Sequence, residues 1–187
     1  MLGLAFYGVP FLVTQRGGAP DKDPSPFHAI PIGVDVLLTH CPPWGCLDLM
    51  EGSAAPYGSS KALLGALRRV RPGAHLFGHV HEQRGVWWRE GGWEAPSAGG
   101  AAAAAAAWKG GVEYSPPHVP KAAMAPSAPP PADLPVQLLS NNAMKNHPHW
   151  EGGVGRLAAG GRLITATLGG GGRWVFSLGA PPPAAPE

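Results

Sequence analysis

The sequence has little charge, few cysteines and no long apolar run. Charged residues make up 14% of the 187 residues, about half the usual quarter. The net charge of +2 is too small to indicate an electrostatic nucleic-acid binder. Apolar runs all fall short of the roughly 18 residues that a membrane-spanning helix needs, so we expect no membrane segment. Cys41 and Cys46 are too few for a disulfide framework, and a cytoplasmic location is the default expectation.

Glycine and proline are abundant instead, at 28 and 23 residues, a share at which low-complexity sequence is expected. The 44% hydrophobic content and seven tryptophans indicate that part of the chain folds. Composition divides the chain into residues 1–93, an Ala/Pro/Gly-rich segment 94–133, and residues 134–187, which end in a Pro-rich tail. We expect 94–133 to be a disordered insertion, since the alanine run at 101–107 lacks the amphipathic face by which a helix would dock.

Strands and a helix alternate in the first part. Short strands are predicted at 4–7, 34–39 and 74–77. A helix is predicted at 61–70, after an N-cap at Ser59 or Ser60 and before a proline–glycine stop. Strand, helix and strand at this spacing form a βαβ-like unit and favour an α/β architecture. In the last part we expect a strand at 136–139 and a hairpin of 162–168 with 173–178.

Histidines follow two of these strands. His40 ends the strand at 34–39, and His79 and His81 follow the strand at 74–77. In an extended segment His79 and His81 point to the same side. If the strands are neighbours, three imidazoles meet at their carboxyl ends, where open α/β sheets bind ligands. Imidazole is the commonest metal ligand. The alternative is a set of surface or satisfied histidines, and the spacing matches no zinc finger.

Longer motifs around these histidines carry a family resemblance. DVLLTHCPPWG at 35–45 and RPGAHLFGHVHE at 71–82 resemble the calcineurin-like metallophosphoesterases, closest to the metallophosphoesterase-domain-containing (MPPED-type) subgroup. GSSKALL at 58–64, LAFYGVP at 4–10 and SNNAM at 140–144 are similar to further segments of that subgroup. The two histidine motifs are specific as a pair, and the other segments support them.

The resemblance implies a fold and a metal chemistry. It predicts the C-terminal half of a metallophosphoesterase α/β/β/α sandwich carrying the low-complexity insertion. In the family, the histidines matching His40 and His79 bind one metal and the one matching His81 binds the other. Two divalent ions, Mn, Fe or Zn, clamp the phosphate and activate the attacking water. The partner that the resemblance implies is a phosphate-ester small molecule, a phosphodiester such as a cyclic nucleotide, and not a nucleic acid or a membrane.

Three other motifs of the family have no counterpart here. Its Asp-X-His, Gly-Asp-X-X-Asp and Gly-Asn-His motifs precede the equivalent of residue 4. The aspartates that we considered as substitutes lie in none of these settings: Asp21, Asp23, Asp35, Asp48 and Asp133. His147 and His149 form a loop pair, and Cys41 is either a soft ligand or a small buried neighbour. We therefore expect a truncated phosphoesterase, inactive alone and holding at most one ion, with no catalytic residue assigned. The alternative is a non-catalytic mononuclear metal-binding or interaction module.

Overall fold

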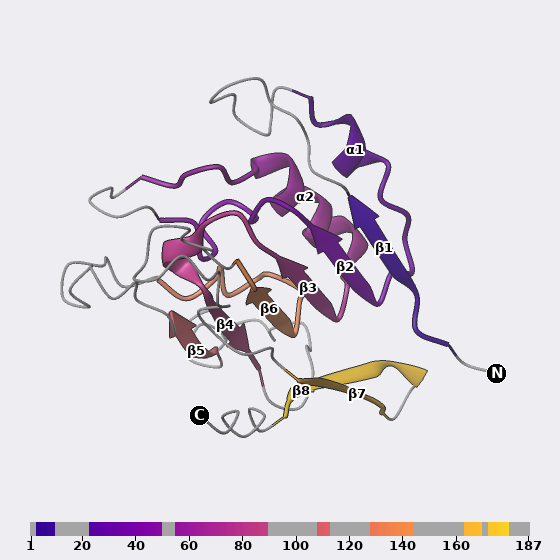
Figure 1. Cartoon of the computed structure of the whole chain (residues 1–187). Coiled ribbons are helices and arrows are strands. Elements are labelled where there is room, and N and C mark those ends of the chain that lie inside the picture. Colours follow the sequence, from indigo (N-terminus) through magenta and orange to yellow (C-terminus); the bar gives the residue numbers. More distant parts are fainter. Residues whose placement is uncertain are drawn as a thin grey trace, which may run out of the picture.

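The computed structural model describes residues 3–9, 23–49, 55–89, 108–112, 128–143, 163–169 and 172–179. Six strands form one sheet in the order β1-β2-β3-β6-β4-β5, and two more form a hairpin (Figure 1). The strands are β1 (Phe6–Val9), β2 (Val36–Thr39), β3 (Ala74–Phe77), β4 (Gly85–Trp88), β5 (Lys109–Val112), β6 (Leu138–Asn141), β7 (Ile164–Leu168) and β8 (Trp174–Leu178). The helices are α1 (Ser25–His28), α2 (Lys61–Val70) and the 3-10 helix η2 (His81–Gln83).

Helix α2 follows the sequence prediction to the residue. The Ser60 side chain accepts a hydrogen bond of 2.9 Å from the Leu63 N–H and caps the first turn. Arg71 closes the last turn in the left-handed conformation, with φ of 59°. The buried side of the helix consists of Leu63, Ala66, Leu67 and Val70. None of the described helices is long and apolar enough to cross a membrane.

Strand direction decides where the loops of the sheet meet. β1, β2, β3 and β6 run parallel to one another, whereas β4 runs antiparallel to both β6 and β5. Val36 of β2 lies beside Ala74 of β3. The carboxyl ends of β2 and β3 therefore lie next to each other, and the segments that carry the histidines leave the sheet at the same edge.

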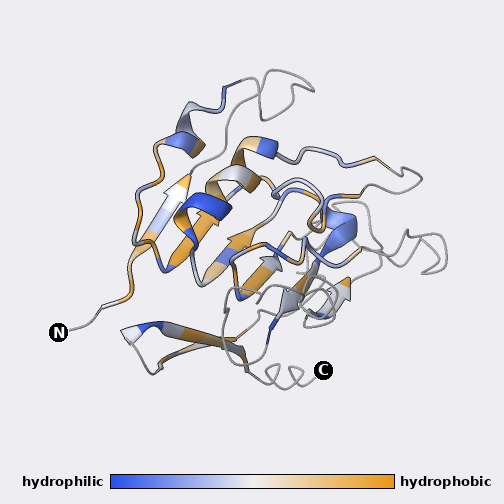
Figure 2. Cartoon of the chain, turned by 180° about the vertical axis from the view of Figure 1, so that it is seen from behind, coloured by the Kyte–Doolittle hydropathy of each residue, from blue (hydrophilic) through white to orange (hydrophobic). Residues whose placement is uncertain are grey.

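Two hydrophobic cores cover the two faces of the sheet. In the first, Leu37 and Leu139 pack with Phe27 of α1 and Leu67 of α2. In the second, the other faces of the same strands pack with the hairpin, whose Phe176 is 3% exposed. Figure 1 shows α1 and α2 above the sheet and β7–β8 below it. In Figure 2 the central strands are orange, as expected for strands covered on both faces.

The predicted mixed α/β architecture is confirmed as a helical layer, a six-stranded sheet and a hairpin layer. The sequence did not predict β4, β5 or α1. β5 lies inside segment 94–133, so the expectation of disorder is wrong for residues 109–112. The described residues 128–133 also pack onto the fold. The alanine run, His147, His149, Asp21 and the Pro-rich tail lie outside the described residues.

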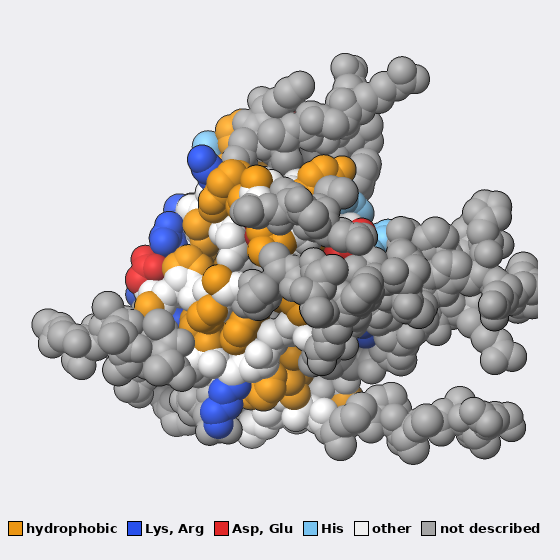
Figure 3. Space-filling view, turned by 90° about the vertical axis from the view of Figure 1, so that its left-hand side faces the viewer, with side chains coloured by type: hydrophobic (Ala, Val, Ile, Leu, Met, Phe, Trp, Pro, Cys, Tyr) orange, Lys and Arg blue, Asp and Glu red, His pale blue; other side chains and the backbone are white. Residues whose placement is uncertain are grey.

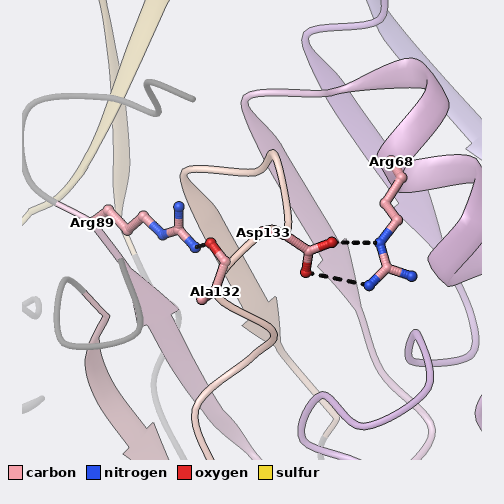
Figure 4. Close-up of polar contacts among 4 residues, drawn as sticks. All are labelled: Arg68, Arg89, Ala132 and Asp133. Atoms are coloured by element: carbon pink, nitrogen blue, oxygen red, sulfur yellow. Dashed lines mark hydrogen bonds and ion pairs between the residues drawn. The ribbon is translucent and has the colours of Figure 1, made fainter. Parts of the chain in front are cut away.

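Two arginines, one on α2 and one directly after β4, bind residues 132 and 133 (Figure 4). Arg68 of α2 donates to both carboxylate oxygens of Asp133, at 3.2 and 3.3 Å. This pair is exposed, so it contributes at most about 1 kcal/mol. Arg89, which is buried, donates to the Ala132 carbonyl at 2.9 Å and lies 4.0 Å over the Trp108 ring. Arg89 thus joins β4 to two segments that lie far from it in the sequence.

Candidate metal centre

The two strand ends bring His40 and His79 into contact. His40 comes directly after β2, and His79 follows β3 after Gly78. The Nε2 atom of His40 lies 3.1 Å from the Nδ1 atom of His79. The rings meet edge to face, with centroids 5.0 Å apart. A further hydrogen bond of 3.1 Å, from the Gly78 N–H to the His40 carbonyl, ties the two turns together.

This nitrogen–nitrogen distance suits two ligands of one ion. Two imidazole nitrogens bound to a tetrahedral Zn²⁺ at 2.0–2.1 Å lie about 3.3–3.4 Å apart. Burial lowers the pKa of His40, and the charges of His79 and His81 lower it further. Burial and His81 also lower the pKa of His79, against an opposing effect of Glu82. Both imidazoles are therefore held in the neutral form that binds a metal.

His79 has an unusual backbone conformation. Its φ is +74°, in the left-handed region that few non-glycine residues adopt. The Val80 N–H donates to the Gly78 carbonyl at 3.0 Å, which makes His79 the central residue of a tight γ-type turn. Such strain costs on the order of 1–3 kcal/mol and is concentrated at functional sites. The turn directs the His79 ring toward His40.

Tyr57 and Gly58 support the His79 ring from the loop before α2. The Tyr57 ring is parallel to the His79 ring within 3°, at a centroid distance of 5.8 Å. Gly58 has φ of +61°, and a Cβ atom there would overlap the Nε2 side of the His79 ring. A side chain at position 58 would therefore displace His79. Apart from the place of Gly58 in the GSSKALL segment, nothing in the sequence indicated a role for either residue.

Asn141 holds the turn that carries His81. This fully buried side chain donates to the carbonyls of Val80 and Gln83, at 2.8 and 3.0 Å, and accepts from the Ala143 N–H at 2.9 Å. His81 is the first residue of η2, between those two carbonyls. Asn141 lay within the SNNAM resemblance, but nothing in the sequence indicated this bonding.

His75 supports the His40 turn from inside the first core. The Thr39 hydroxyl donates to the Cys41 carbonyl at 2.7 Å, so its oxygen accepts from His75 Nε2–H at 2.9 Å. Among the residues that the structure describes, the buried Nδ1 atom of His75 has no hydrogen-bond partner. Complete burial lowers the pKa of His75 to about 3. His75 is therefore neutral, with its proton on Nε2.

The remaining candidates are placed as follows. His40, His79 and His81 are half-buried, and Figure 3 shows histidine side chains at the surface beside acidic ones. Cys41 is buried and not in a disulfide. The other described aspartates that we considered have bonds elsewhere: Asp23 to Ser25, Asp35 to the Ala5 N–H, Asp48 to the Gly45 N–H and Asp133 to Arg68. Within the described ranges, no three His, Cys, Asp or Glu side chains are grouped closely enough to hold a metal ion.

Comparison with known proteins agrees with the histidine motifs. The chain is 40% identical over 81 residues to metallophosphoesterase domain-containing protein 1 of Homo sapiens and of Mus musculus. The matched part is 43% of this chain and 24% of each relative. Over the matched part, the chain is similar to these metallophosphoesterase domain-containing proteins.

A UPF0046 protein of Caenorhabditis elegans is 37% identical over 94 residues, covering 46% of this chain and 22% of the relative. The chain thus spans about a quarter of the length of these curated relatives. No family model matches the chain, and no solved structure matches it.

Proposed function

We propose that His40, His79 and His81 hold a divalent metal ion in a site that binds phosphoric esters. The contact between His40 Nε2 and His79 Nδ1 at the carboxyl edge of the sheet is the observation that supports it most. The relatives named for a metallophosphoesterase domain support the same chemistry. His81 joins the set because it lies two residues after His79, as the first residue of η2 at the same edge of the sheet.

The donor set suits Zn²⁺ or Fe²⁺, since neutral imidazole binds borderline metals, and Mn²⁺ is the third ion that the family resemblance implies. When bound, such an ion polarises a phosphoryl oxygen and lowers the pKa of a bound water. The protein fixes the positions of the ligands. The tight turn at His79 and the close approach of Gly58 fix the His79 ring, and the hydrogen bond between His75 and Thr39 fixes the turn that carries His40. We infer that the substrate is a small phosphodiester such as a cyclic nucleotide.

We further propose that the 187 residues bind one ion and turn over phosphodiesters poorly. A two-metal site needs carboxylate ligands as well as imidazoles. Asp35 lies before β2, at the edge of the sheet opposite His40, and Asp133 pairs with Arg68. The single His40–His79 contact also favours the second candidate, a non-catalytic mononuclear metal-binding or interaction module.

Two measurements on the purified chain, loaded with Mn²⁺ or Zn²⁺, test these proposals. Hydrolysis of bis-p-nitrophenyl phosphate should not exceed that of a His81→Ala variant, and a robust turnover that depends on His81 would overturn the claim of poor activity. Orthovanadate, a phosphate analogue, should bind the loaded chain and not the His40→Ala variant. Metal binding without vanadate binding would favour the non-catalytic module.

A further inference from the structure

A cavity of about 330 Å³ lies at the edge of the sheet opposite the histidines. Its wall includes Asp35, Gly73 and Gln137, which directly precede β2, β3 and β6, and Trp174, the first residue of β8. The amino ends of these parallel strands cannot lie at the same edge as their carboxyl ends. The cavity is therefore separate from the candidate metal centre, and its volume is within the range of small-molecule sites.

Basic side chains predominate around the cavity. Of the described charged residues, Arg69, Arg71 and Arg173 line it together with Asp35. The charged side chains give a formal charge of +2, which exceeds the negative half-charge at the C-terminal end of α2. Arg69 also donates to the carbonyls of Phe27, His28 and Ile30, at 3.3, 3.1 and 2.9 Å, and so its position is fixed.

The apolar wall is rigid. The Gln137 side chain accepts from the Phe176 N–H at 2.8 Å and donates to the Phe176 carbonyl at 2.7 Å. A Cβ atom on Gly73 would overlap the Phe176 ring, so the ring lies directly against the backbone that enters β3. With Trp174 beside it, this wall offers a preformed aromatic surface next to the arginines.

We propose that this cavity binds a small organic anion with a flat apolar body, such as an aryl phosphonate or an aryl carboxylate. Arginine binds carboxylate and phosphate-like groups through two parallel hydrogen bonds, and the aromatic wall receives the apolar body. Arg173 and Arg71 bind the anionic group, and Trp174 and Phe176 contact the ring. This cavity includes neither the proposed metal ion nor the histidines, so the test of the cavity is independent of the test of the proposed function.

Phenylphosphonate is the probe, because its carbon–phosphorus bond resists phosphoesterases. Binding to the full chain is measured by calorimetry in EDTA, with benzyl alcohol as the uncharged analogue and inorganic phosphate as the ringless one. Phenylphosphonate should bind more tightly than either, and added salt should weaken it. Arg173→Gln should weaken it by about tenfold or more. The matched control is Arg68→Gln. Arg68 lies outside the cavity, where it forms an exposed ion pair with Asp133.

The Arg68→Gln and His40→Ala variants should bind the probe as the wild type does. Arg71→Asn, which tolerates the left-handed conformation, should weaken binding as Arg173→Gln does. Three results would overturn the proposal: no binding at millimolar concentration, equal binding by Arg173→Gln, or loss of binding in His40→Ala. The last would place the probe at the histidines instead.

Discussion

Acidification should destabilise the protein through His75. Its pKa is about 3 in the folded chain, against an ordinary value of 6.5. Between these two values the unfolded chain binds a proton at His75 and the folded chain does not, so stability falls as the pH falls below 6.5. The loss approaches about 1.4 kcal/mol per pH unit and reaches about 2 kcal/mol at pH 5 relative to pH 7.5. That is a large part of an ordinary folding free energy.

The assay is urea unfolding followed by tryptophan fluorescence at both pH values, in EDTA. His75→Gln removes the titration and keeps an N–H near the position of Nε2, so the Thr39 contact is retained. This variant should lose about 2 kcal/mol less than the wild type between the two pH values. His28→Gln, which removes an exposed histidine, is the control.

Other titrating groups contribute to the pH dependence of stability, but their contributions cancel when the wild type is compared with His75→Gln. His40 and His79 have lowered pKa values and act in the same direction, while burial raises the pKa of Asp48, which acts in the opposite direction. All three are present in both proteins. If His75→Gln lost as much stability as the wild type, the buried neutral state of His75 would be refuted. NMR tests the same point without a substitution: the chemical shifts of the His75 ring should not change between pH 7.5 and about 5.

Two further substitutions test the supports of the histidines. Gly58→Ala should displace His79 and weaken Zn²⁺ binding by about tenfold or more. The control is Gly65→Ala, in open space on α2, which should stabilise the fold by about 0.5–1 kcal/mol. Equal Zn²⁺ affinity of the wild type and both variants would contradict the role of Gly58. Asn141→Ala should lower the free energy of unfolding by about 2–4 kcal/mol, because it leaves buried carbonyls unpaired. The control Asn142→Ala, at a half-buried position, should lower it less. Equal losses of the two variants in urea unfolding would contradict the role of Asn141.

The parts of the fold that local signals specify were predictable. α2 and β3 match the predicted ranges because Ser60 caps the helix and Pro72–Gly73 separates the two elements. β1 lies two residues later than predicted, at Phe6–Val9, because a strand extends only where a partner pairs with it, here Val36–Thr39. β5 has the sequence KGGV, which has no apolar alternation, and it is a strand only through its pairing with β4.

In the candidate site, the meeting of the histidines was predictable and their supporting contacts were not. The meeting of His40 and His79 followed from two neighbouring parallel strands, which the βαβ spacing predicts. The supports of these histidines come from elsewhere: Gly58 from a loop, and Asn141 from a strand 61 residues beyond its hydrogen-bond partner Val80. No local pattern records such contacts, because they depend on the order of strands in the finished sheet.

Metal content tests the central claim most directly. The chain is incubated with Zn²⁺ or Mn²⁺, passed through a desalting column and analysed by mass spectrometry for bound metal. We predict about one ion per chain, lost in His40→Ala and in His79→Ala and retained in His28→Ala. A wild-type chain that retains no ion, or a His40→Ala variant that retains the same amount as the wild type, would contradict the metal centre.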